Sequence, residues 1–207
     1  MEENQLVHPE LAEVEIEPIS RSDVLMKGAL AAGAVYGLGM VGPFLRQALA
    51  GSGDVDILNY ALTLEYLESA FYREAKSRVK ASGTLKSLIN LLSSDEDQHV
   101  AALTASIKQL GGKPVKAPKV AFPYNDTAGF LKLAQTFEDT GVSAYNGAAP
   151  MISSKAVLGS AGAIVQVEAR HAAAIRLQNK AEPAPDAFDP SLTMNQVLTA
   201  VKPYVKS

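Results

Sequence analysis

The chain has 207 residues, of which 47% are hydrophobic and 20% charged, and its net charge at pH 7 is −3. This mildly acidic balance provides no basic face for nucleic acid, so a nucleic-acid partner is not expected. The absence of cysteine excludes disulfides, thiolate metal ligands and thiol catalysis. The composition is typical of one globular domain with additional terminal segments.

Residues 1–50 differ in composition from the rest of the chain. Residues 1–20 contain six acidic side chains and no Lys or Arg, which predicts a solvated, disordered tail. Residues 28–45 are uncharged and rich in Gly and Ala, and the stretch that begins at Ser20 resembles a twin-arginine export signal in which Ser22 replaces the second arginine. Two interpretations follow: an exported protein or one attached to a membrane through residues 28–45, or a cytoplasmic protein whose apolar helix packs on the bundle or on another subunit of a homo-oligomer.

The first half of the remaining chain predicts two long helices. Residues 54–83 contain no proline and place apolar and acidic side chains at helical spacing, and Gly83 is expected to end this helix. Thr84 is expected to cap a second helix that ends at Gly111 and Gly112. Residues 113–125 contain three prolines and have no helical periodicity, so they predict a crossover loop.

The second half repeats this arrangement. Asp126 is expected to cap a third helix that runs to about Ala149, and a fourth helix is predicted over residues 154–179. Residues 181–191 predict a loop, after which Thr193 and Gln196 form a capping box for a short last helix that runs to about Val201.

Four long helices with the long connection between the second and third predict an all-α fold, an up-down-down-up four-helix bundle of ferritin-like topology. The predicted organisation is a tail with the apolar amino-terminal segment over residues 1–50, the bundle over 54–180, and a loop with a short helix over 181–207.

Two polar patterns are each repeated within these helices. The second and fourth helices each contain Glu-x-x-His, and the first and third each contain a Glu seven residues before a Tyr. The second copy follows the first by 72 residues for Glu-x-x-His and by 73 for Glu–Tyr, which indicates internal duplication of a two-helix unit. The residues concerned are Glu65, Tyr72, Glu96, His99, Glu138, Tyr145, Glu168 and His171.

This set has the composition of a two-metal site. One Glu from each of two helices and Glu-x-x-His from each of the other two supply four carboxylates and two imidazoles to the interior of a bundle. Four carboxylates balance the charge of two divalent ions, which removes the cost of burying them unpaired. Carboxylate and imidazole together suit iron or manganese better than calcium or magnesium.

Other interpretations of single residues stay open at this point. The polar neighbours of Glu96 and His99 are also typical of an exposed charged turn, and both tyrosines could be ordinary core residues. Glu68 lies on nearly the same helical face as Glu65 and competes with it as a ligand. The duplication favours Glu65, because Glu68 aligns with Gly141.

The stretches "ILNYALTLEYLESAFY", "DEDQHVAAL", "FEDTGVSAYNGAAP" and "VEARHAAAIR" resemble the ferritin-like superfamily. The likeness is strongest to the bacterial ferritin-like domain proteins related to plant desiccation-related proteins. The resemblance implies that two iron ions, or manganese, are bound, and that two tyrosines lie beside the ligands. The ligands it implies are Glu65, Glu96, His99, Glu138, Glu168 and His171, and the tyrosines are Tyr72 and Tyr145.

Two functions are compatible with this resemblance. The first is a di-iron oxidase or peroxide-detoxifying protein of ferroxidase type, with Fe(II) and O₂ or peroxide as reactants. The absence of cysteine argues against the rubredoxin-fused peroxidases, which need a Cys-ligated iron. The second is a stress or desiccation protein whose bundle protects or binds partners, with a structural or vestigial metal site. Redox turnover by the metal-loaded protein separates the two.

Overall fold

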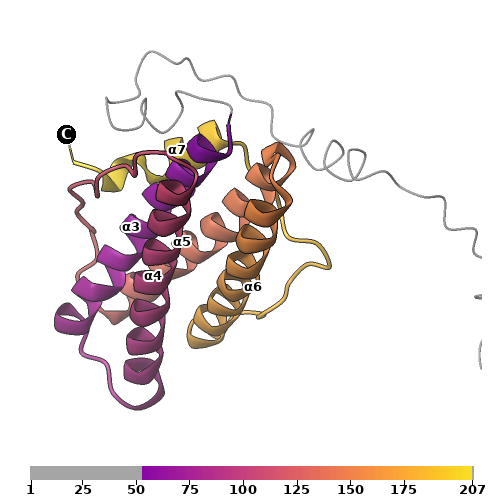
Figure 1. The fold of residues 1–207 in the computed structure, drawn as a ribbon. Helices are drawn as coiled ribbons and strands as arrows, with labels where there is room; N and C mark the ends of the chain where they lie inside the picture. Colours follow the sequence, from indigo (N-terminus) through magenta and orange to yellow (C-terminus); the bar gives the residue numbers. More distant parts are fainter. Residues whose placement is uncertain (1–52, 207) are drawn as a thin grey trace, which may run out of the picture. The chain divides into compact units, whose positions relative to one another are not determined.

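The structure is a computed structural model that describes residues 53–206, and the predictions made for residues 1–50 lie outside this range. Helices dominate the described residues (Figure 1). The four long helices are α3 (Asp54–Arg78), α4 (Gly83–Gln109), α5 (Thr127–Ala148) and α6 (Lys155–Gln178). The short elements are η3 (Ala149–Met151), α7 (Met194–Val201) and η4 (Lys202–Tyr204).

The four long helices form two hairpins. Helix α3 packs chiefly on α4, and α5 packs chiefly on α6, while fewer contacts join α3 to α5 and α4 to α6. The short helix α7 packs against α5. This arrangement confirms the predicted all-α bundle. None of the helices among the described residues is long and apolar enough to span a membrane.

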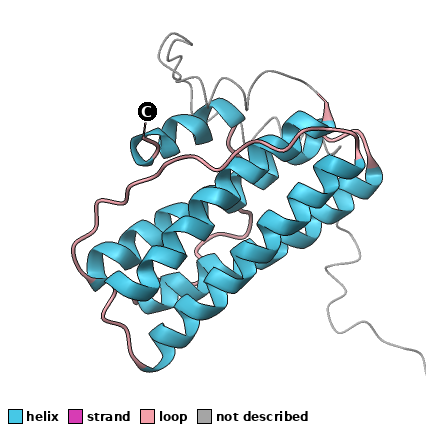
Figure 2. Cartoon of the chain, turned by 60° about the vertical axis from the view of Figure 1, so that its left-hand side comes forward, coloured by secondary structure: helices cyan, strands magenta, loops and turns pink. Residues whose placement is uncertain are grey.

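The two hairpins are joined by an extended connection that runs along the bundle (Figure 2). Residues 113–125 of this connection, at about 3.3 Å each, reach about 43 Å, which matches the roughly 40 Å length of the 27-residue helix α4. Arg78 holds this connection by donating to the carbonyl oxygens of Phe122 at 3.3 Å and Tyr124 at 2.5 Å. An isolated bridge between Val120 and Val205 ties it to the carboxyl-terminal segment.

The turn within the first hairpin differs from the prediction. Helix α3 ends at Arg78, the backbone of Val79 is extended, and Gly83 is the first residue of α4 with a φ of +53°. A left-handed φ favours glycine, so Gly83 serves the entry into α4 rather than the end of α3. The N-cap of α4 is Ser82, and the predicted cap at Thr84 is therefore wrong.

The other helix ends follow the predicted chemistry. Gly111 adopts a φ of +75° just after α4, as expected for a glycine that stops a helix. The Asp126 side chain accepts from the Gly129 amide at 2.7 Å at the start of α5. The Thr193 and Gln196 capping box is present at the start of α7.

The apolar core lies in two clusters along the bundle. The larger one centres on Phe71, whose ring contacts those of five aromatic neighbours: Tyr72, Phe122, Tyr124, Phe130 and Phe137. The smaller one joins the first turns of α3 and α6 to the last turns of α4. Buried apolar packing at both places fixes the four helices around the polar side chains described next.

Candidate metal centre

Six ionisable side chains from the four long helices meet in the interior of the bundle. The four carboxylates are fully buried, and the two imidazoles are 8% and 4% exposed. All six are predicted ligands, and the structure brings every one of them into two groups that share two members. They are Glu65 on α3, Glu96 and His99 on α4, Glu138 on α5, and Glu168 and His171 on α6.

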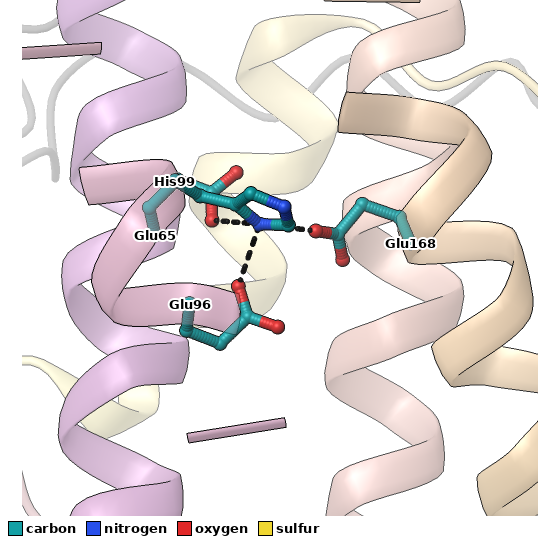
Figure 3. A group of neighbouring side chains, drawn as sticks. All are labelled: Glu65, Glu96, His99 and Glu168. Atoms are coloured by element: carbon teal, nitrogen blue, oxygen red, sulfur yellow. Dashed lines mark hydrogen bonds and ion pairs between the residues drawn. The ribbon is translucent and has the colours of Figure 1, made fainter. Parts of the chain in front are cut away.

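The first group, here the His99 position, gathers around one ring nitrogen. Nδ1 of His99 lies 3.2 Å from Glu65 Oε2, 3.1 Å from Glu96 Oε2 and 3.0 Å from Glu168 Oε1 (Figure 3). Three carboxylates therefore face a single imidazole nitrogen from three helices. Glu96 and His99 lie three residues apart on one face of α4, as the Glu-x-x-His pattern predicts.

The second group, here the His171 position, has the same composition. Nδ1 of His171 lies 3.0 Å from Glu96 Oε1 and 3.6 Å from Glu138 Oε2, and Glu168 completes the group. In each group one donor atom from every member lies within 4.8 Å of the others. Glu96 and Glu168 belong to both groups, which gives the arrangement of two terminal and two shared carboxylates that a two-metal site requires.

Two tyrosines hold the terminal carboxylates, and each reaches across to the other half of the bundle. The Tyr145 hydroxyl on α5 donates to Glu65 Oε1 at 2.5 Å, and the Tyr72 hydroxyl on α3 donates to Glu138 Oε1. Burial and the adjacent carboxylate raise the pKa of both phenols, so they remain protonated donors. Each terminal carboxylate thus has one oxygen fixed and turns the other toward its imidazole.

The remaining donor atoms of the cluster have no well-aligned hydrogen-bond partner among the described residues, although four of the oxygens lie 3.0–3.6 Å from an imidazole Nδ1. Leaving a buried polar atom unpaired costs about 1–3 kcal/mol, so six such atoms at one place require a ligand or a compensating charge. Divalent cations satisfy carboxylate and imidazole donors together. The residues present therefore fit a pair of metal ions. The atoms are Glu65 Oε2, Glu96 Oε1, Glu138 Oε2, both oxygens of Glu168 and His171 Nδ1.

The electrostatics of the cluster also favour cations. Burial, opposed in part by hydrogen bonds from the imidazoles, raises the pKa of Glu96 to about 7, and burial with the neighbouring carboxylates raises that of Glu168. Burial alone would lower the pKa of both histidines. The facing carboxylates outweigh it and raise the pKa to about 12 for His99 and about 11 for His171. Positive charge is thus strongly stabilised at both positions.

Glu68 is a fifth buried carboxylate beside the cluster, and it belongs to neither group. Burial, followed by the charge of Glu168, raises its pKa. Its side chain occupies the space left by Gly141, because a Cβ atom there would lie 3.2 Å from Glu68 Oε1 and 3.3 Å from Glu168 Oε2. The duplication pairs Glu68 with Gly141, and the Glu68 side chain fills the space that a side chain at residue 141 would need.

The imidazole edges of the cluster face a surface cleft of about 410 Å³ between α4 and α6. Its walls are largely apolar, with Leu88, Leu91 and Leu92 on α4, and Asp95, Gln98 and Arg170 add polar groups. Asp95 directly precedes Glu96 but lies outside the duplicated pattern that predicts the ligands, because Val167 stands at the corresponding position of the second half. The Asp95 carboxylate lies 3.2 Å from Nε2 of His171.

Comparison with known proteins agrees with this geometry. The sequence model of the ferritin-like domain family matches residues 53–181, which span all four long helices. No curated protein matches the chain. The match covers more than half of the chain, so the protein belongs to the ferritin-like domain family, and its buried carboxylate and histidine cluster is compatible with a two-metal site.

Proposed function

We propose that this member of the ferritin-like domain family holds two iron ions and oxidises Fe(II) at the expense of O₂ or peroxide. The observation that carries the proposal is the convergence of six buried donor residues into two groups with two shared carboxylates. Manganese suits the same donors, and metal analysis of protein from its own host identifies the ion.

Each of the six donor residues has a role in this proposal. Glu65 and His99 would hold one ion, Glu138 and His171 the other, and Glu96 and Glu168 would contact both. Metal ions bound there supply a one-electron redox couple and open coordination positions for the oxidant. The reaction balances with two ferrous ions as reductant: O₂ takes up two electrons and two protons to give hydrogen peroxide, and peroxide takes up the same number to give two waters.

The chain's own residues support this chemistry by fixing geometry and controlling access. Tyr72 and Tyr145 hold one oxygen of each terminal carboxylate, which orients the other oxygen toward the site. The four carboxylates are fully buried, so bulk water is excluded from that side. The cleft between α4 and α6 leaves the imidazole edges accessible to small reactants.

The test is metal loading followed by turnover. Purified full-length apo chain is loaded anaerobically with Fe(II), and we expect about two ions per chain. Exposure to O₂ or peroxide should then give Fe(III) formation and oxidant consumption well above the rate of free Fe(II). His99→Ala and His171→Ala should each lose much of this activity, whereas Glu182→Gln, which alters an exposed acid, should not.

Two results would contradict the proposal. Trace metal after loading would show that the cluster does not bind ions. Two bound ions without turnover would favour the structural role, in which the metal only stabilises the bundle.

A further inference from the structure

The two halves of the bundle differ at one position that touches the candidate metal centre. Asp95 on α4 places Oδ2 3.2 Å from Nε2 of His171. The 72-residue offset that pairs Glu96 with Glu168 also pairs Asp95 with Val167. Both residues line the cleft between α4 and α6, so they occupy corresponding places beside the two imidazoles.

Val167 cannot accept a hydrogen bond, and His99 therefore lacks the partner that His171 has. Within residues 53–206, every polar contact of the His99 ring is made by Nδ1: the contacts with Glu65, Glu96 and Glu168. The outer nitrogen, Nε2, has none within this part of the chain. His171 is bonded on both sides, with carboxylates facing Nδ1 and Asp95 facing Nε2.

This difference affects which ring nitrogen of each imidazole carries the proton and which offers a lone pair to a cation. A neutral imidazole has one ring proton, and a carboxylate at Nε2 keeps the proton there and leaves the lone pair on Nδ1. The same carboxylate raises the basicity of the ligating nitrogen and fixes the ring plane. A His99 that binds a metal ion through Nδ1 carries its proton on Nε2, and Val167 offers that proton no acceptor, so neither the tautomer nor the ring plane is fixed from this side.

The other unmatched acid does not cancel this effect. Glu68, whose counterpart is Gly141, lies beside Glu168. Because Glu168 belongs to both groups, the charge of Glu68 acts on both positions.

We propose that the two positions bind divalent metal with unequal affinity and that the His171 position fills first, because Asp95 orients and polarises its imidazole. Asp95 is a positioning residue in this scheme. The inference rests on the proposed function, since it requires two metal positions.

The experiment is an anaerobic Mn(II) titration of the apo full-length chain at pH 7, with free Mn(II) measured by electron paramagnetic resonance. Loss of a group that hydrogen-bonds a metal-ligating histidine typically costs about 10–100-fold in affinity. Wild type should therefore show two steps whose Kd values differ by about 10–100-fold. Glu65→Gln leaves the His171 position intact, and Glu138→Gln leaves the His99 position intact.

Asp95→Asn, measured in each of these two single variants, distinguishes an effect on the His171 position from an effect on the His99 position. It should weaken Mn(II) binding about 10–100-fold in the Glu65→Gln protein and leave the Glu138→Gln protein unchanged. Val167→Asp introduces the corresponding carboxylate beside His99, and it should tighten Mn(II) binding in the Glu138→Gln protein. Far-UV circular dichroism verifies folding, and Asp95→Ser replaces Asp95→Asn if the latter does not fold.

Two outcomes overturn the inference and leave the proposed function standing. The first is that wild type binds two Mn(II) ions in a single step of equal affinity. The second is that Asp95→Asn weakens Mn(II) binding equally in both backgrounds, which would indicate a general effect of charge. Absence of Mn(II) binding in wild type would also overturn the inference, whereas the proposed function falls only if Fe(II) loading fails as well.

Discussion

Metal should strongly stabilise this protein, and the size of the effect follows from the cluster. An ion that binds only the folded state adds about 2.7 kcal/mol at a hundredfold excess over Kd, so two ions add about 5 kcal/mol. For a chain of about 150–250 residues each kcal/mol moves Tm by roughly 2–4 °C. We therefore expect Fe(II) or Mn(II) to raise Tm by about 10–20 °C over chelator-treated protein.

Replacing both terminal carboxylates, Glu65→Gln with Glu138→Gln, should abolish this metal-dependent increase in Tm. Its effect on the apo protein depends on two opposing terms. Each substitution removes a carboxylate that faces an imidazole, and breaking a buried ion pair costs about 3–5 kcal/mol.

The second term favours the variant. The cluster and Glu68 together hold five buried carboxyl groups and only two imidazoles, so the acidic groups outnumber the imidazoles by three. Removing two of the five lowers like-charge repulsion, and the remaining carboxylates still face both imidazoles. We expect this relief to dominate, so the apo variant should melt at or above the temperature of apo wild type.

The assay is thermal melting followed by circular dichroism, with chelator and with anaerobic Fe(II) or Mn(II). Glu182→Gln is the control, since this exposed acid should leave both melting temperatures unchanged. A wild-type Tm that ignores metal would refute the two-metal assignment. An apo variant that melts several degrees below apo wild type would show that the imidazole–carboxylate pairs, not the surplus charge, dominate the energetics.

Three further predictions concern neighbouring groups. Glu68→Gln should raise the Tm of the apo protein and leave two metals bound; loss of one metal on elemental analysis would make Glu68 a ligand. Because burial raises the pKa of Glu96 to about 7, the folded apo protein binds more protons than the unfolded chain, so its stability should fall as pH rises from 5.5 to 8. An apo Tm that rises over this range would contradict the sign. Gly147→Ala should lower Tm, because the new Cβ would lie 1.9 Å from the Leu192 carbonyl oxygen and displace the segment before α7; an unchanged Tm would show that this segment yields at no cost.

Much of the fold could be predicted because its signals are local. Helical spacing of apolar residues, the Asp126 cap and the Thr193 capping box each act within one turn of helix, so the sequence displays them directly. The first interhelical turn is mispredicted because the local sequence does not specify which of the two helices Gly83 belongs to. A glycine in a left-handed conformation serves either the end of one helix or the entry into the next, and only the path of the chain at Val79 distinguishes them.

The duplicated polar pattern placed the candidate ligands in corresponding parts of the chain, but it carries no information on contacts between helices. The crosswise hydrogen bond from Tyr145 to Glu65 and the contact of Asp95 with His171 both join residues more than 70 positions apart. Arg78 anchors the crossover connection through the carbonyl oxygens of Phe122 and Tyr124, which lie 44 and 46 positions further along the chain. Such contacts depend on how the hairpins are packed together, which spacing within one helix does not specify.

The distribution of donors across the hairpins explains why metal should act on the whole fold. The helices pack extensively within each hairpin and less between hairpins. The His99 position takes Glu65, Glu96 and His99 from the first hairpin and Glu168 from the second, and the His171 position likewise draws on both. Neither hairpin can complete a position alone. Ions that bind there therefore hold the two hairpins together at their weaker interface, and their removal should loosen the contact between hairpins before it unfolds the helices within them.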